Sequence, residues 1–332
     1  MKRVVIFAHF DKQNIIDPYV IDYLKELRKY SEIIFVSDGD LEQREISKIS
    51  DLCFDNICQK HGEYDFGSYK RGFKLLKTKY LEKFNKLDEV LFVNDSCYLV
   101  GTFERIFSEM DQKPEIDFWG LTDNYIDSEN IEYHIQSYFL SFRRNVFLDR
   151  KFQKFIYNIT KLKDKSSIVD LYEVGLSQFL IQKNKKMLCY FSSREVDKYI
   201  IDNKFKLFSD VKEIYDKHSI FYLYVYNYVY SDKFYVLLLQ GMPLLKVSLL
   251  HINVSVGDKL TFFWHDIIIK LNLNGKDKII KHNTRLGHEI KNKHFKKLEY
   301  IPTKCIKLFI RIKLSNYFRL SLFGIRILKI KL

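Results

Sequence analysis

Polar side chains come directly after a short apolar run between Leu87 and Gly101. Residues 90–93 are apolar, as expected of a buried strand, and Asn94, Asp95 and Ser96 follow them. Open α/β sheets bind their ligands outside the carboxyl ends of the strands, where these three residues would lie. A carboxylate between an amide and a hydroxyl oxygen suits a hard divalent cation, Mg²⁺ or Mn²⁺, with Asp95 as the metal ligand. The alternative is a polar turn in which Asp95 caps a helix.

Two further stretches carry residues that suit an anionic ligand. Asp38 closes a strand-like run and could accept hydrogen bonds from a base or a ribose. Gly67 and Ser68 are predicted to open a helix, whose free N–H groups can face an anion. Lys70 and Arg71 follow closely enough to neutralise a diphosphate. The alternatives are an ordinary turn after a strand and a capped amphipathic helix.

A third group of residues suits sugar hydroxyls and proton transfer. Asp117 and Trp119 belong to a stretch in which a Trp-Gly pair offers a flat apolar platform for a sugar, while His134 and Gln136 would contact hydroxyls. Glu173 is predicted near a helix start, where the helix dipole favours a carboxylate even without a function. It is also the candidate general base. For Trp119 and His134, the alternative is a buried ring and a hydrogen-bonded core histidine.

Strands and helices that alternate along the chain must position these residues. Apolar runs predict strands at residues 4–8, 32–37, 90–93, 116–121, 138–142 and 187–191. Helical spacing predicts helices at residues 18–30, 41–50, 65–84, 103–110, 147–160 and 171–182, the first with Asp17 as N-cap before Pro18. This order favours a parallel or mixed sheet with helices on both faces. Residues 249–273 look strand-like, and the sequence leaves open whether they form a separate domain.

The positive charge is concentrated near the C-terminus. Residues 289–332 hold twelve Lys or Arg and two Glu, a net charge of +10 out of the total of +13. Their mixture with aliphatic residues favours a segment lying on an anionic membrane surface, with a packed, basic-faced helix as the alternative. Nucleic acid is not the expected partner, because few aromatic residues could stack on bases. Five scattered cysteines and a first apolar run too short for a signal peptide indicate a cytoplasmic protein.

Seven blocks of sequence resemble, in order, the signature blocks of the rhamnan synthesis protein F family. They are HFD (9–11), YDFGSYKRG (64–72), VNDSCY (93–98), DFWGLT (117–122), HIQSYFLSF (134–142), YEVGL (172–176) and GMPLLK (241–246). This is a family of bacterial polysaccharide glycosyltransferases. The resemblance covers residues 1–250, which are expected to form the glycosyltransferase domain, and leaves residues 251–332 as a C-terminal extension.

The resemblance implies a GT-A-like, nucleotide-sugar-binding mixed sheet in which Asp38 contacts the nucleotide and Glu173 is the base. A DxD metal motif would fall at residues 94–96, but only one carboxylate stands there, so the implied divalent metal at Asp95 departs from the pattern. The residues expected to bind the acceptor are Asp117, Trp119, His134 and Gln136. The implied donor-binding residues are His9, Asp11, Asp38, Gly67, Ser68, Lys70, Arg71, Asn94, Asp95 and Ser96.

The activity implied is transfer of a sugar from a nucleotide-sugar donor, dTDP-rhamnose in this family, to a growing cell-surface polysaccharide. The acceptor would be lipid-linked, which places the enzyme at the inner face of the cell membrane with its basic tail on the lipid. Two other functions remain open on the sequence. One is a non-catalytic scaffold that binds a nucleotide sugar or glycan, and the other is a sugar-phosphate transferase.

Overall fold

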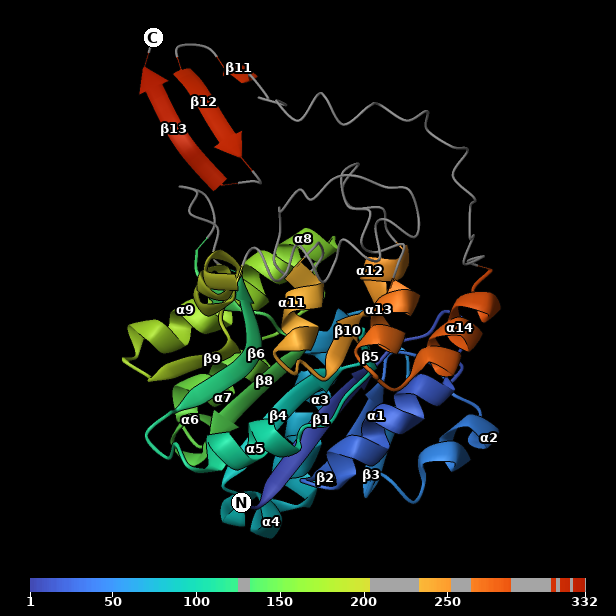
Figure 1. Cartoon of the computed structure of the whole chain (residues 1–332). Coiled ribbons are helices and arrows are strands. Elements are labelled where there is room, and N and C mark those ends of the chain that lie inside the picture. The colour runs from blue at the N-terminus through green and yellow to red at the C-terminus, as the bar shows by residue number, and fades with distance from the viewer. Residues whose placement is uncertain are drawn as a thin grey trace.

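The centre of the fold is a mixed sheet of eight strands (Figure 1). The computed structural model describes residues 1–124, 132–203, 233–251 and 264–287, and the backbone of three C-terminal strands. The strands follow the order β3-β2-β1-β4-β8-β6-β7, with β9 beside β6. Their bounds are β1 (Arg3–His9), β2 (Glu32–Ser37), β3 (Asp55–Cys58), β4 (Glu89–Asn94), β6 (Phe118–Asn124), β7 (His134–Ile135), β8 (Phe139–Arg143) and β9 (Met187–Phe191).

Alternate residues of each strand enter two separate hydrophobic clusters, one on each face of the sheet. In β1, Val5 and Phe7 belong to one cluster, while Val4 and Ile6 belong to the other. All seven residues of β1 are buried. A strand covered on both faces needs no polar alternation, which explains the nearly continuous apolar run in its sequence.

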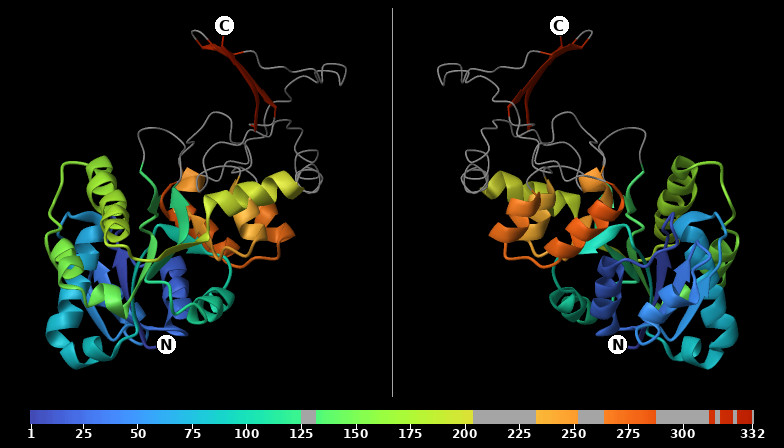
Figure 2. Two further views of the ribbon diagram at one scale, coloured as in Figure 1. Left: turned by 90° about the vertical axis from the view of Figure 1, so that its left-hand side faces the viewer. Right: turned by 90° about the vertical axis from the view of Figure 1, so that its right-hand side faces the viewer.

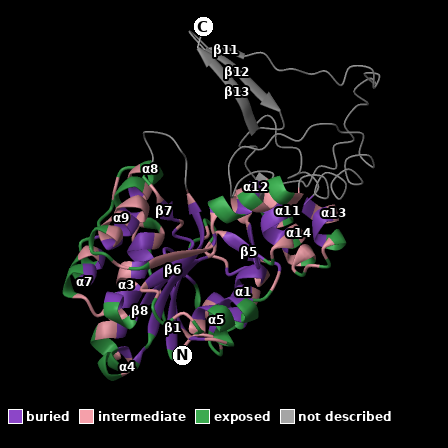
Figure 3. Ribbon diagram, turned by 60° about the vertical axis from the view of Figure 1, so that its left-hand side comes forward, coloured by how far each residue is buried: buried purple, intermediate pink, exposed green. Residues whose placement is uncertain are grey.

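Helices cover both faces of the sheet (Figures 2 and 3). The first face carries α1 (Pro18–Arg28), α2 (Gln43–Ile46), α5 (Glu104–Asp111), α11 (Lys233–Leu239), α12 (Val247–His251), α13 (Trp264–Lys270) and α14 (Lys276–Arg285). The second carries α3 (Tyr64–Lys79), α4 (Leu81–Lys86), α6 (Arg144–Phe147), α7 (Arg150–Tyr157), α8 (Lys165–Ile168) and α9 (Gly175–Gln182). The predicted α/β mixed sheet with helices on both faces is therefore confirmed.

Three local predictions need correction. The helix predicted over residues 65–84 is divided at Tyr80 into α3 and α4. The alternative in which Asp95 caps a helix is wrong, because strand β5 (Cys97–Leu99) follows the turn and pairs with β10 (Leu244–Lys246). In the strand-like stretch 249–273, residues 264–270 form helix α13, and residues 252–263 lie outside the described part.

The core extends past the boundary expected at residue 250. Trp264, Ile267 and Ile268 of α13 are buried in the first cluster at helical spacing, together with Ile279 of α14. Helices α13 and α14 therefore share the hydrophobic core of the preceding residues.

The described part of the basic tail is β-structure. Strands β11 (Ile312–Leu314), β12 (Tyr317–Leu322) and β13 (Ile325–Lys331) pair antiparallel, and the other residues after 287 lie outside the described part. Among all residues that the structure describes, no helix has the length and apolar character needed to cross a membrane.

Candidate functional site

Polar residues of three neighbouring strands meet at one edge of the sheet. Strands β1, β2 and β4 are parallel, so their carboxyl ends lie side by side. The Nδ1 of His9 lies 3.0 Å from the Ser37 hydroxyl, and its Nε2 lies 3.9 Å from Asp95. Burial lowers the pKa of His9 to about 4, so its ring is neutral at physiological pH. This carboxyl edge is where open α/β sheets bind ligands.

The Asn94-Asp95-Ser96 turn is held in place by hydrogen bonds from three directions. The Asn94 amide donates to Asp65 at 2.9 Å, and its oxygen accepts from the Ser96 backbone N–H at 3.1 Å and from the Ser96 hydroxyl. The backbone N–H of Phe10 donates to the Asp95 carboxylate at 2.9 Å. Burial raises the pKa of Asp95 to about 7, and the negative charges of nearby Asp11 and Asp65 act in the same direction.

Glu173 lies at the same edge, on a π-helical stretch (Val169–Val174). One carboxylate oxygen accepts from the Ser137 backbone N–H at 2.8 Å and from the Ser137 hydroxyl, and the other lies 3.3 Å from His134 Nε2. Burial raises the pKa of Glu173, but the hydrogen bonds from His134 and Ser137 outweigh it, and the pKa is lowered overall. The carboxylate is therefore ionised. Single π-helical turns occur often at functional sites.

His134 is expected to report directly on this ion pair. Burial lowers its pKa, but the hydrogen bond to Glu173 raises it above the ordinary 6.5. In Glu173→Gln the carboxylate is gone, so burial should bring the pKa of His134 below that of the wild type, as an NMR titration of its ring protons will measure. Asp170→Asn, on the exposed side of the same π-helical stretch, should leave the titration unchanged. An unshifted His134 in Glu173→Gln would contradict the ion pair.

Gly67 does not provide the free N–H group that the sequence predicted. Helix α3 begins three residues earlier, and the Gly67 N–H already donates to the Glu63 carbonyl at 3.0 Å. The cations that follow are also engaged, because Lys70 and Arg71 lie 2.6 Å and 2.8 Å from the Glu63 carboxylate. The Ser68 hydroxyl lies 3.0 Å from the ring of His61. These residues organise the start of α3 in this structure.

Asp38 holds the loop that leads into α3. One of its carboxylate oxygens accepts from the backbone N–H groups of His61 at 2.6 Å and Gly62 at 2.7 Å. Gly62 has a positive φ of 68°, which its lack of a side chain permits. Asp38 thus lies at the carboxyl edge as expected, and the hydrogen bonds of this oxygen are to the protein's own backbone.

The stretch with Asp117 and Trp119 lies away from this edge, at the amino end of β6. Trp119 has no exposed surface, and its indole N–H donates to the buried Glu89 at 2.8 Å. A ring without exposed surface cannot stack on a sugar, so the predicted platform is wrong. Asp117 accepts from the Lys186 backbone N–H at 2.7 Å. Gln136 does lie at the carboxyl end of β6, where it accepts from the Thr122 hydroxyl at 2.6 Å.

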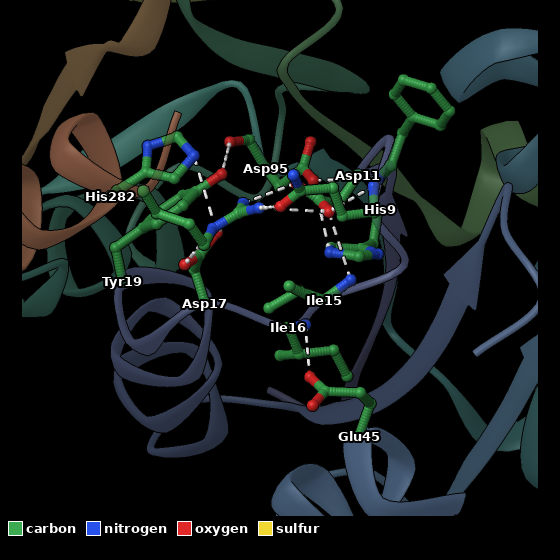
Figure 4. A network of polar contacts seen from close by, with 12 residues as sticks. His9, Asp11, Ile15, Ile16, Asp17, Tyr19, Glu45, Asp95 and His282 are labelled. Carbon is green, nitrogen blue, oxygen red and sulfur yellow. Dashed lines mark hydrogen bonds and ion pairs between the residues drawn. The ribbon is translucent and has the colours of Figure 1, made fainter. Parts of the chain in front are cut away.

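Arg285 of α14 binds the loop after β1, and no local sequence pattern indicated this contact. Figure 4 shows Asp11, Asp17 and His282 of the same network. The Arg285 guanidinium donates to Asp11 at 2.6 Å and also to Asp17, which uses its carboxylate here rather than to cap α1. His282, one turn earlier, lies 3.5 Å from Asp17. Burial raises the pKa of Asp11, but the bonds from Arg285 and two backbone N–H groups lower it overall.

Lys246 and Asp65 are two further site residues that local sequence patterns did not single out. Strand pairing places Lys246 opposite Cys97, and its ammonium donates to the Ser96 hydroxyl at 2.9 Å. Asp65 binds Asn94 from the first turn of α3. Both belong to blocks that carried the family resemblance, GMPLLK and YDFGSYKRG, and those blocks were the one signal available.

The predicted metal site finds little support in the side chains around Asp95. Among the residues described, no three His, Cys, Asp or Glu side chains group in a way that could hold a metal ion. The Asn94 oxygen already accepts two hydrogen bonds from Ser96, and Asp95 is the one carboxylate of the turn. A divalent cation at this turn would have Asp95 as its one carboxylate ligand and would take its other oxygen ligands from water and from the phosphates of a bound donor.

The mixed sheet makes this an α/β protein, and its candidate site lies at the edge where such sheets bind ligands. Rhamnan synthesis protein F matches residues 33–233, well over half of the chain, and the chain belongs to this family.

Individual proteins match more partially. The virulence protein VirA of Vibrio anguillarum is 28% identical over 188 residues, which are 54% of this chain and 56% of VirA. The chain therefore spans about half the length of this curated relative.

Two solved structures are similar to parts of this chain, each at 13% identity. The glycosyltransferase GlyE of Streptococcus pneumoniae has a TM-score of 0.37, with 86% of this chain and 64% of GlyE covered. Residues 1–349 of TarS from S. aureus have a TM-score of 0.32, with 46% and 49% covered. With TM-scores this low, neither likeness bears on the family assignment.

Proposed function

We propose that this protein is a glycosyltransferase that moves a sugar from a nucleotide-sugar donor to a hydroxyl group of a growing cell-surface polysaccharide. Family membership supports the reaction class. The observation that carries the proposal is the carboxylate of Glu173, held ionised by His134 and Ser137 at the edge of the sheet where ligands bind. An ionised, oriented carboxylate at such an edge can take the proton of an acceptor hydroxyl.

The chemistry requires one proton transfer and one displacement. Glu173 accepts the proton of the acceptor hydroxyl, whose oxygen forms a bond to the anomeric carbon of the donor. The bond between that carbon and the diphosphate oxygen breaks, and the nucleoside diphosphate leaves with the electron pair. His134 and Ser137 orient Glu173 for this step and stabilise its charge before the proton arrives.

The donor pocket is proposed to lie over the carboxyl ends of β1, β2 and β4. His9, Asp38 and the Asn94-Asp95-Ser96 turn meet there, and Asp11 lies on the adjoining loop. We propose dTDP-rhamnose as the donor, in keeping with the family. Calorimetry with dTDP-rhamnose, UDP-glucose and GDP-mannose tests this, with the tightest binding expected for dTDP-rhamnose. Binding of none of the three would contradict the donor site.

Metal dependence is decided separately by chelation. The turn offers Asp95 as one carboxylate where a DxD motif has two, so we expect turnover to be unchanged in excess EDTA. A loss that Mg²⁺ or Mn²⁺ restores would instead assign Asp95 as the metal ligand.

The acceptor is proposed to be lipid-linked, with the basic tail on the anionic inner face of the cell membrane. Residues 289–332 carry a net charge of +10, and basic residues near an anionic surface contribute about 1 kcal/mol each. Deletion of residues 291–332 should therefore release the protein from anionic vesicles in a co-sedimentation assay. Neutral vesicles serve as the control, and unchanged sedimentation with anionic vesicles would refute the role of the tail.

A further inference from the structure

We propose that Lys246 binds the diphosphate of the donor and stabilises it as the leaving group. This inference rests on the proposed function, because it assigns a residue to the leaving group of that reaction. Lys246 ends β10, far along the chain from the turn that it contacts.

The backbone fixes Lys246 beside the Asn94-Asp95-Ser96 turn. Strand β10 pairs antiparallel with β5, so that Lys246 lies opposite Cys97, and the Val247 N–H donates to the Ser96 carbonyl at 2.9 Å. A turn at Gly241, whose φ is 90°, precedes this strand. A cation on a paired strand is positioned more precisely than one on a loop.

The Lys246 ammonium lies against both the Asn94-Asp95-Ser96 turn and an aromatic ring. The ammonium donates to the Ser96 hydroxyl at 2.9 Å and lies 4.4 Å from the centre of the Tyr138 ring. It also attracts the buried carboxylate of Asp65. Lys246 is half-buried, and charges interact more strongly where water is partly excluded.

Other cations at this edge are tied to carboxylates of the protein. Lys70 and Arg71 both bind Glu63, and Arg285 binds Asp11 and Asp17. A diphosphate would have to break these ion pairs before it could use the three cations. Lys246 instead contacts the Asn94-Asp95-Ser96 turn itself, through the Ser96 hydroxyl at 2.9 Å.

Lys246 acts where negative charge develops during the reaction. As the bond to the anomeric carbon breaks, the electron pair passes to the diphosphate oxygen. An ammonium group within hydrogen-bond distance of that oxygen stabilises the transition state more than the ground state, where the charge is smaller. The reaction then requires no reactant other than the donor and the acceptor.

Calorimetry with dTDP, UDP and GDP on the full chain tests the assignment. Lys246→Met should weaken binding of the diphosphate preferred by the wild type by about 10-fold or more. The same substitution should weaken binding of the corresponding nucleoside monophosphate by a smaller factor. Lys246→Arg should recover most of the affinity for the diphosphate. Thermal unfolding of each variant shows that it is folded.

Lys83→Met is the matched control. Like Lys246, Lys83 lies over an aromatic ring, that of Phe54 at 4.6 Å. It binds Glu32 at the start of β2, away from the carboxyl edge of the sheet. This substitution should leave the affinity unchanged. Equal affinities for wild type and Lys246→Met would overturn the assignment while leaving the proposed function standing. Absence of binding to all three diphosphates by the wild type would overturn both.

Discussion

Glu173→Gln is expected to lower the rate of sugar transfer by about 10²- to 10⁴-fold, the usual contribution of a general base. Glutamine keeps the size of the side chain and can still accept the hydrogen bonds that Ser137 donates to Glu173. It cannot take a proton from the acceptor hydroxyl. Donor binding should persist, because the carboxylate acts on the acceptor. The measurement is single-turnover release of the nucleotide, with donor affinity determined in parallel.

Asp170→Asn is the control that distinguishes loss of the general base from loss of a negative charge on the same helical stretch. Asp170 is exposed on the same π-helical stretch, so its neutralisation should leave the transfer rate near that of the wild type. Full turnover by Glu173→Gln would remove Glu173 from the role of base. Asp95, whose raised pKa lies near 7, would then be the next carboxylate to test.

Arg285→Gln is expected to lower the free energy of unfolding by about 3 kcal/mol, because it leaves Asp11 and Asp17 without their cation. Asp17 is almost fully buried, and the loss of the guanidinium partner of a buried carboxylate is costly. The loop after β1 should loosen as a result, and with it the Phe10 N–H that holds Asp95. Urea unfolding near neutral pH measures the change.

Lys278→Met provides the comparison on the same helix. Lys278 pairs with Asp22, but both side chains are partly exposed, and such surface pairs contribute about 0–1 kcal/mol. A similar small loss for Arg285→Gln would show that the link between α14 and the first loop is not important for stability.

The fold was predictable where the apolar pattern was continuous. Strand β2 was expected at the bounds observed, since a strand that is buried along its length leaves a clear apolar run. Helix α13 was mistaken for a strand, because the alternation around it resembled a strand pattern more than the three buried positions that fix it to the core. Strands β3 and β5 are short and were not expected.

The site residues that could be predicted are those at the ends of apolar strands. Asn94, Asp95 and His9 follow or end apolar runs, so their meeting at one edge follows from parallel pairing. Trp119 could not be placed, because an aromatic residue within a strand looks the same whether it is buried or exposed. Lys246 and Arg285 contact residues that lie 150 and 274 positions away, and such contacts depend on the tertiary fold.

The nucleotide product tests the central claim most directly. The full chain is incubated with dTDP-rhamnose, UDP-glucose and GDP-mannose, with and without a membrane-lipid extract from its own organism, and the nucleotides are resolved by chromatography. A glycosyltransferase is expected to release a nucleoside diphosphate in amounts that rise with the lipid extract. Release of a nucleoside monophosphate would identify a sugar-phosphate transferase, and binding without any release would identify a non-catalytic scaffold. Either result would contradict the proposed function.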